Sequence, residues 1–272
     1  WDMVSSEPPV AYEGASHTLR LRRVTKSDTT FAEWVTDYSS DAGQPVLQDA
    51  RFKLQDYLEQ LETVCSTVKR KNWMPLESDP ALMNRYIHKL GVSPDYMFHE
   101  VLSVDLLMMV PQPVFAVLLL FPCSENSTAF AKKEAEEIAE KGQKVAKPVY
   151  HMSQTIGNAC GTIGLIHAVL NNIDNLDLDP TKFFAKFAEE TKGMTPAERA
   201  DALERNTDIE EEHQVLASSG GSSVDSPAND NLHFIAFVGV EGDLYEMDGC
   251  KAAPINHGPT TPATLLGDAA KA

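Results

Sequence analysis

The sequence is poor in cysteine, in long apolar runs and in positive charge, and each shortage narrows the classes of protein to which it can belong. The four cysteines form no C-x-x-C pair, which indicates neither a disulfide framework nor a zinc–cysteine site and favours a reducing compartment. The longest apolar run, Val114–Phe121, is far shorter than the roughly 20 residues of a membrane-spanning helix. We therefore expect a cytoplasmic protein, with the nucleus as second candidate, and no membrane partner, metal or cofactor. The cysteines are Cys65, Cys123, Cys160 and Cys250.

Positive charge is scarce mainly in the second part of the chain. Lysine and arginine number 23 against 40 aspartates and glutamates, a net charge of −17. Residues 1–72 have 9 basic against 11 acidic side chains, whereas residues 73–272 have 14 against 29. Such a surface repels nucleic acid and anionic membranes and attracts a basic protein or peptide. The same charge also serves solubility without any partner, and composition does not separate these two interpretations.

The pattern of the sequence changes where the charge changes, so we expect a domain boundary after residue 72. The chain begins with Trp1 and has no signal-peptide pattern, and we expect that it begins inside a longer product. Residues 1–72 contain a short edge strand at Leu19–Val24 and an amphipathic helix over residues 49–71, and their role is not indicated.

Two segments of the second part stand out by composition. Val114–Phe121 lies between two prolines and is predicted to be a strand buried on both faces and central in a sheet. Residues 206–231 hold six acidic and no basic side chains and include the Ser/Gly run Ser218–Ser223. This composition is typical of a long mobile loop between ordered elements.

The strongest chemical signal is the stretch from Gln154 to His167. It is expected to turn at Gly157-Asn158 and to begin a helix at Cys160, because apolar residues then recur at three- and four-residue spacing. A thiol on the first turn of a helix lies near unpaired N–H groups and the positive end of the helix dipole, which favour the nucleophilic thiolate. The amide of Gln154 would supply a hydrogen bond to a developing oxyanion. The alternative is a buried structural cysteine.

A thiol nucleophile needs a base, and His233 is the best of the eight histidines. If Glu241-Gly242 is a two-residue hairpin turn, His233 lies diagonal to Asp248 on one face of the sheet, and a one-residue slip would separate them. An imidazole with a carboxylate to orient it suits a thiol protease. An ordinary strand with a surface histidine is the alternative. His167 lies about 10 Å along the helix from Cys160, so we expect it to be a packing residue. The spacing around His213 does not favour a metal site.

Several long motifs, taken in order, resemble the ubiquitin carboxy-terminal hydrolase family of cysteine deubiquitinases, in particular its small single-domain members of the L3 type. The resemblance covers residues 73–268. It is carried by Trp73–Glu77, Val114–Pro122, Gln154–Ala168, Leu232–Ile235, Leu244–Gly249 and Pro254–Gly258.

The resemblance implies an α/β (α+β) protein with a papain-like cysteine protease fold, in which helices flank a central antiparallel sheet and the backbone is deeply knotted. It makes Cys160 the nucleophile, His233 the general base, Asp248 the residue that orients it and Gln154 the oxyanion donor. Residues 73–272 are then the hydrolase domain, which we expect to lack the family's last helix and strand.

The resemblance also implies a partner and a substrate. Residues 206–231 match the crossover loop of the family, which spans the cleft and admits small or extended leaving groups at the C-terminal glycine of ubiquitin. The acidic surface would meet the basic face of ubiquitin. Nedd8 is a second candidate partner, and we expect a monomer. Four residues match positions near the ubiquitin-binding surface of relatives, namely Pro75, Leu76, Glu77 and Leu232.

Two further interpretations stay open at this point. The chain could be a catalytically silent protein that binds ubiquitin without cleaving it, or a papain-like peptidase of other specificity. Turnover of a ubiquitin substrate distinguishes the first from the expected enzyme, and cleavage of ordinary peptides identifies the second.

Overall fold

The computed structural model describes residues 15–24, 29–40, 42–44, 46–47, 71–219 and 232–272. The chain divides into two compact units, Trp1–Lys69 and Arg70–Ala272, close to the boundary expected after residue 72. In the first unit, β1 (Ala15–Val24) and β2 (Thr29–Tyr38) form an antiparallel hairpin, and β1 contains the expected strand. The expected helix over 49–71 lies outside the described residues except for Lys71. Among the described residues, no helix is long and apolar enough to cross a membrane.

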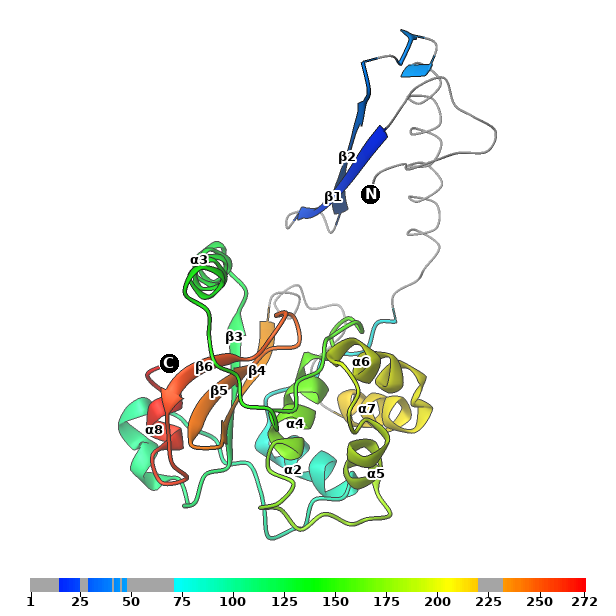
Figure 1. The fold of residues 1–272 in the computed structure, drawn as a ribbon. Helices are drawn as coiled ribbons and strands as arrows, with labels where there is room; N and C mark the ends of the chain where they lie inside the picture. Colours follow the sequence, from blue (N-terminus) through cyan, green and yellow to red (C-terminus); the bar gives the residue numbers. More distant parts are fainter. Residues whose placement is uncertain (1–14, 25–28, 41, 45, 48–70, 220–231) are drawn as a thin grey trace. The chain divides into compact units, whose positions relative to one another are not determined.

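The second unit is built on an antiparallel sheet of four described strands (Figure 1). Their order is β3–β4–β5–β6, with bounds Ala116–Pro122, Leu232–Val240, Asp243–Met247 and Ile255–Pro259. Phe234 and Ala236 face one side of the sheet, and Ile235 and Phe237 face the other, so β4 contributes to separate apolar clusters on the two faces. The prediction of an antiparallel sheet flanked by helices is confirmed.

The prediction for Val114–Phe121 is wrong in two respects. No residue of β3 is fully buried, and Leu119 is 43% exposed. β3 pairs only with β4 among the described strands, so it stands at the end of the sheet rather than in its centre. Its apolar run has another cause, because Leu118 and Leu120 pack on one core cluster while Val117 and Phe121 pack on the other. Partial packing on both faces of a strand favours apolar residues, but it does not require a neighbour on both edges.

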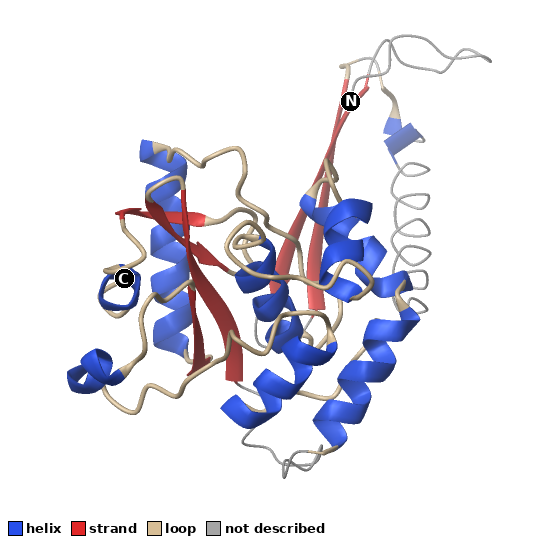
Figure 2. Ribbon diagram, turned by 90° about the horizontal axis from the view of Figure 1, so that it is seen from below, coloured by secondary structure: helices blue, strands red, loops and turns tan. Residues whose placement is uncertain are grey.

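The helix α4 (Cys160–Leu170) packs on β3 and β4, and every residue after Cys160 in it is buried. Small residues allow this close approach: a Cβ at Gly161 would lie 3.1 Å from Leu76, and one at Gly164 would lie 3.3 Å from Leu118. The short helix α8 (Leu265–Ala269) packs on the opposite face of the sheet. Figure 2 shows the sheet between these helical layers. The other helices are α2 (Pro80–Lys89), η1 (Val104–Met109), α3 (Glu125–Lys141), α5 (Phe183–Glu190), α6 (Pro196–Arg205) and α7 (Thr207–Ser218).

The helix α7 corrects the prediction of a loop over residues 206–231. Asn206 caps this helix through a hydrogen bond from the Ile209 N–H, and only residues 220–231 lie outside the described residues. Ile209, His213 and Ala217 are buried at four-residue spacing, which is the periodicity of one helix face. The acidic side chains between them lie on the other faces, so a high density of charge did not mean a loop.

Candidate active site

The β4–β5 hairpin brings His233 and Asp248 together. Val240 pairs with Asp243 and Ala236 with Met247, and the intervening Glu241 and Gly242 have φ angles of 50° and 86°, as a type I′ turn requires. The Nε2 atom of His233 lies 2.8 Å from Oδ1 of Asp248, and their side chains are 13% and 9% exposed. The predicted register and contact are confirmed.

Cys160 is the first residue of α4 and is half-buried. Ala159, which precedes it, cannot cap the helix with its side chain. Among the described residues, no side chain accepts a hydrogen bond from the first backbone N–H groups of α4. Burial lowers the pKa of His233, but its hydrogen bond to Asp248 and its interaction with Cys160 outweigh burial and raise this pKa to about 10. An imidazole that is readily protonated next to a thiol is the arrangement that stabilises a thiolate.

Gln154 packs against Gly249, the residue after Asp248. Its N–H donates to the carbonyl of Gly249 over 2.8 Å, and a Cβ at Gly249 would lie 2.9 Å from the Cβ of Gln154. The side-chain Nε2 donates to the carbonyl of Ile156 over 3.2 Å, which occupies one of its two N–H groups. The side-chain oxygen is buried and accepts no hydrogen bond from the described residues. The role of oxyanion donor stays a prediction.

The loop before Cys160 is held by the start of the second unit. The N–H of Gly157 donates to the carbonyl of Lys71, and the N–H of Trp73 donates to the carbonyl of Gly157, each over 2.9 Å. The two segments run parallel at this point. A Cβ at Gly157 would lie 2.3 Å from the side-chain oxygen of Asn72, so a larger residue there would displace the exposed Asn72 side chain. This contact fixes the loop three residues before the thiol.

Two residues that the sequence analysis did not select support Asp248. His151 is 3% exposed, and its Nε2 donates to the backbone carbonyl of Asp248 over 2.9 Å. Its ring stacks on that of His167 at 5.3 Å between centroids. The N–H of Cys250 donates to Oδ1 of Asp248 over 2.8 Å. Burial tends to raise the pKa of Asp248, but its hydrogen bond to His233 and the other nearby donors hold it below its usual value.

A second cluster ties the Asp248 turn to the rest of the sheet. The Nζ atom of Lys251 lies 2.7 Å from Glu134 on α3 and 2.6 Å from Glu246 on β5, and Glu246 also pairs with His257 on β6 at 3.1 Å. Glu134, Glu246 and His257 could geometrically hold a metal ion. In the structure, however, the ammonium of Lys251 supplies the positive charge between the two carboxylates.

Two other histidines are placed as packing residues. His167 is fully buried in α4, and burial lowers its pKa to about 3. The prediction that it packs rather than serves Cys160 is confirmed. His213 is also fully buried, with Nδ1 2.8 Å from the hydroxyl of Thr162 and Nε2 2.6 Å from the carbonyl of Met74. Burial lowers the pKa of His213 to about 4.

The four predicted substrate contacts differ in their accessibility. Leu76 is 8% exposed and packs on α4 at Gly161, so it belongs to the core. Pro75 and Glu77 are half-buried, and Leu232 at the start of β4 is 39% exposed. Their roles in substrate binding stay predictions.

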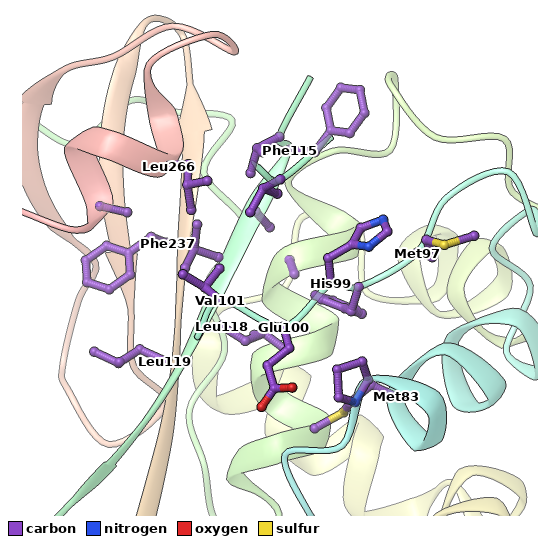
Figure 3. A pocket seen from close by; sticks show the side chains of 18 of the residues that line it. Met83, Met97, His99, Glu100, Val101, Phe115, Leu118, Leu119, Phe237 and Leu266 are labelled. Carbon is purple, nitrogen blue, oxygen red and sulfur yellow. The ribbon is translucent and has the colours of Figure 1, made fainter. Parts of the chain in front are cut away.

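An apolar groove in the second unit lies elsewhere. It has a volume of about 900 Å³ and is lined by residues of the 95–104 segment and of β3. Figure 3 shows it, with His99 and Glu100 among mainly apolar side chains such as Leu118 and Leu119. Cys160, His233 and Asp248 do not line it, so the groove is separate from the group of candidate catalytic side chains.

Residues 73–272 match the family model for ubiquitin carboxyl-terminal hydrolase, family 1. A probable ubiquitin carboxyl-terminal hydrolase of Dictyostelium discoideum is 45% identical over 206 residues, which cover 74% of this chain and 80% of that protein. Ubiquitin carboxyl-terminal hydrolase 3 of Arabidopsis thaliana is 44% identical over 216 residues, which cover 78% of this chain and 90% of that protein. Ubiquitin carboxyl-terminal hydrolase isozyme L1 of Homo sapiens is 45% identical over 199 residues, which cover 72% of this chain and 87% of that protein.

The fold leads to the same family. The catalytic domain of Trichinella spiralis UCH37, whose crystal structure was determined bound to ubiquitin vinyl methyl ester, superposes with a TM-score of 0.55 at 26% identity. The superposition covers 74% of this chain and 86% of that chain. The motifs, the family model and the fold agree, and the chain belongs to the ubiquitin carboxyl-terminal hydrolase family.

Proposed function

We propose that this protein is a deubiquitinating thiol hydrolase that cleaves ester, amide or isopeptide bonds at the C-terminal glycine of ubiquitin. The observation that carries the proposal is the arrangement of Cys160, His233 and Asp248, in which a thiol at a helix N-terminus adjoins an imidazole that a buried carboxylate holds at 2.8 Å. The family to which the chain belongs names the chemistry, and the acidic surface complements the basic face expected of the partner.

The proposed reaction begins when His233 takes the proton of Cys160. The thiolate attacks the carbonyl carbon of the terminal glycine, and the negative charge that develops on oxygen is stabilised by the uncapped N–H groups of α4 and by the free N–H of the Gln154 amide. Protonated His233 then gives its proton to the leaving group. A water molecule, deprotonated by His233, hydrolyses the thioester and releases ubiquitin and the thiol.

Cys160, His233 and Asp248 form the catalytic triad of this proposed reaction, and other residues hold the triad in place. Asp248 keeps the imidazole oriented and stabilises its protonated form. His151 and Cys250 fix the backbone and the carboxylate of Asp248. Small or extended leaving groups are the proposed substrates, with Nedd8 as a second modifier to be compared with ubiquitin.

The test is a ubiquitin probe with an electrophilic C-terminus, applied to the full chain. We expect one covalent adduct at Cys160, no adduct with Cys160→Ala, and normal labelling of the control Cys123→Ala, whose exposed thiol lies after β3. A matched Nedd8 probe measures the preference between the two modifiers. Labelling of folded protein at another cysteine would refute the assignment, and labelling without turnover of a ubiquitin substrate would favour a silent ubiquitin-binding protein.

A further inference from the structure

Three side chains of different metal-ligand chemistry meet at the outer side of the triad. His233, Asp248 and Cys250 each offer one ligand atom, and these atoms all lie within 4.8 Å of one another. We propose that they form an inhibitory site for a borderline-soft divalent cation such as Zn²⁺, which withdraws His233 from catalysis while it is bound. The inhibitory effect rests on the proposed function, whereas the binding site itself does not.

The backbone explains why the three atoms converge. The hairpin register delivers His233 to Asp248, and a turn after β5 brings Cys250 back beside the same carboxylate. In this turn the N–H of Lys251 donates to the carbonyl of Asp248 over 3.1 Å, and the N–H of Cys250 donates to its Oδ1 over 2.8 Å. The turn is fixed from behind by His151. Two of the three ligands are therefore held in place before any ion arrives, which reduces the conformational entropy lost on binding.

Accessibility fits an ion that enters from solvent. The side chains of His233 and Asp248 are only 13% and 9% exposed, whereas Cys250 is exposed. The thiol thus stands at the entrance, with the imidazole and the carboxylate behind it. The nearby positive charge of Lys251 is offset, because its ammonium is paired with both Glu134 and Glu246.

The set of donors selects the type of cation. Nitrogen, oxygen and sulfur together suit Zn²⁺, whereas Ca²⁺ and Mg²⁺ prefer sets of oxygen atoms. Tetrahedral bonds of about 2.0–2.3 Å place ligand atoms about 3.3–3.8 Å apart. Binding therefore opens the 2.8 Å contact of His233 with Asp248 slightly, and rotation of the exposed Cys250 side chain about χ1 adjusts the position of its sulfur. Water fills the fourth position.

Binding involves no change of oxidation state. The Cys250 thiol loses its proton to solvent as the sulfur–metal bond forms, and His233 gives its lone pair to the metal once its own proton has been displaced. A metal bound at the Nε2 atom that faces Asp248 leaves the remaining ring proton on the nitrogen that faces Cys160, so His233 can no longer accept the proton of the thiol. Hydrolysis therefore stops while the ion is bound, and it resumes when a chelator removes the ion.

The binding experiment uses Co²⁺ as a spectroscopic substitute for Zn²⁺ in the full chain carrying Cys160→Ser, which removes the catalytic thiol as a ligand. We expect a thiolate-to-cobalt charge-transfer band that Zn²⁺ displaces. The band should vanish in Cys160→Ser/Cys250→Ser and persist in the control Cys160→Ser/Cys123→Ser. Absence of the band, or a band that survives the loss of Cys250, would overturn the proposal.

The kinetic experiment measures inhibition of ubiquitin-substrate hydrolysis by ZnCl₂. The turnover of each variant with Zn²⁺ is expressed relative to its own turnover without metal. We expect Cys250→Ser, which retains the backbone N–H that holds Asp248, to need at least a tenfold higher Zn²⁺ concentration for half-inhibition. Equal sensitivity of the two proteins would mean that Zn²⁺ acts through Cys160 and His233 alone, which would refute the role of Cys250. If the metal-free protein does not hydrolyse the ubiquitin substrate, the proposed function is contradicted. The cobalt band would still show whether the metal site exists.

Discussion

His151 donates a hydrogen bond from Nε2 to the backbone carbonyl of Asp248, at 2.9 Å, while the carboxylate of Asp248 is held from its other end by His233 and the Cys250 N–H. Asp248 is therefore fixed both at its backbone and at its carboxylate. Because His151 is 3% exposed and stacks on the buried His167, this support is part of the core. The position of the imidazole of His233 thus depends on packing behind the site as well as on the hairpin.

Replacing His151 with Phe should lower kcat/KM. The substitution keeps the stacked ring but removes the hydrogen bond, whose net worth of about 1 kcal/mol corresponds to roughly a fivefold effect. The matched control is His88→Phe in α2, which removes a similar 2.8 Å bond from an imidazole to the carbonyl of Tyr96. Steady-state kinetics should separate the two variants, and an equal loss of activity in both would argue against a positioning role for His151.

Replacing Asp248 with Asn should reduce kcat by about 10²- to 10⁴-fold, because the neutral amide does not stabilise the positive charge of the protonated imidazole. The pKa of His233 should fall at the same time, which NMR titration of the ring can follow. Asp201→Asn changes an exposed carboxylate on α6 in the same way and should have no effect. A kcat within threefold of the unmodified protein would remove Asp248 from the mechanism.

Protonation of His213 should lower the free energy of unfolding at acidic pH. Its folded-state pKa of about 4 lies below the unfolded value of about 6.5, so its contribution to stability is complete above pH 6.5 and is lost as the pH falls toward 4. The free energy of unfolding should drop by up to about 1.4 kcal/mol per pH unit from this group. Urea unfolding at several pH values should show a smaller slope for His213→Leu, and an unchanged slope for His99→Leu, which replaces an exposed histidine.

Gly249→Ala should impair both stability and activity. The new Cβ would lie 2.9 Å from the Cβ of Gln154 and 3.0 Å from Ile163, and relief of such overpacking costs about 1–3 kcal/mol. Because Gln154 and Asp248 adjoin this glycine, kcat should fall even at temperatures at which the variant is fully folded. Gly267→Ala is the control, since a Cβ there meets no atom within 4 Å, and thermal unfolding should show no loss for it.

Lys251→Met should destabilise the fold by about 1–3 kcal/mol, because it leaves the mostly buried carboxylates of Glu134 and Glu246 without their shared cation. The exposed pair of Lys132 and Glu136 provides the comparison, and Lys132→Met should change stability by less than about 0.5 kcal/mol. Denaturant unfolding at neutral pH measures both. Equal values would show that the Lys251 cluster behaves as an ordinary surface ion pair.

The parts of the structure that local rules govern were predictable from the sequence. The two-residue turn at Glu241-Gly242 fixed the register of its hairpin, and this register placed His233 beside Asp248. The helix start at Cys160 followed from apolar periodicity alone. The sequence patterns and the family resemblance together supplied the fold class and the site.

The parts that the sequence did not indicate depend on contacts between distant segments. Lys251 and Glu134 are separated by 117 positions, and His151 approaches Asp248 only because the sheet and the loop before α4 meet. For β3, the apolar run reflected partial packing on two clusters, but it carried no information about the depth of burial or the edges of the sheet. For α7, the spacing of Ile209, His213 and Ala217 was a usable signal that the density of acidic residues obscured.

The bonds of Gly157 with Lys71 and Trp73 have a mechanical consequence. The polypeptide that leaves the second unit toward the first is fastened at the loop that carries the nucleophile, three residues before Cys160. Tension applied through the N-terminal segment would reach these two bonds, together with the contacts of the Lys71 side chain with Glu204 and Glu210, before it reaches the sheet. The catalytic loop would then yield first, and the enzyme would lose activity under a load that leaves most of its fold intact.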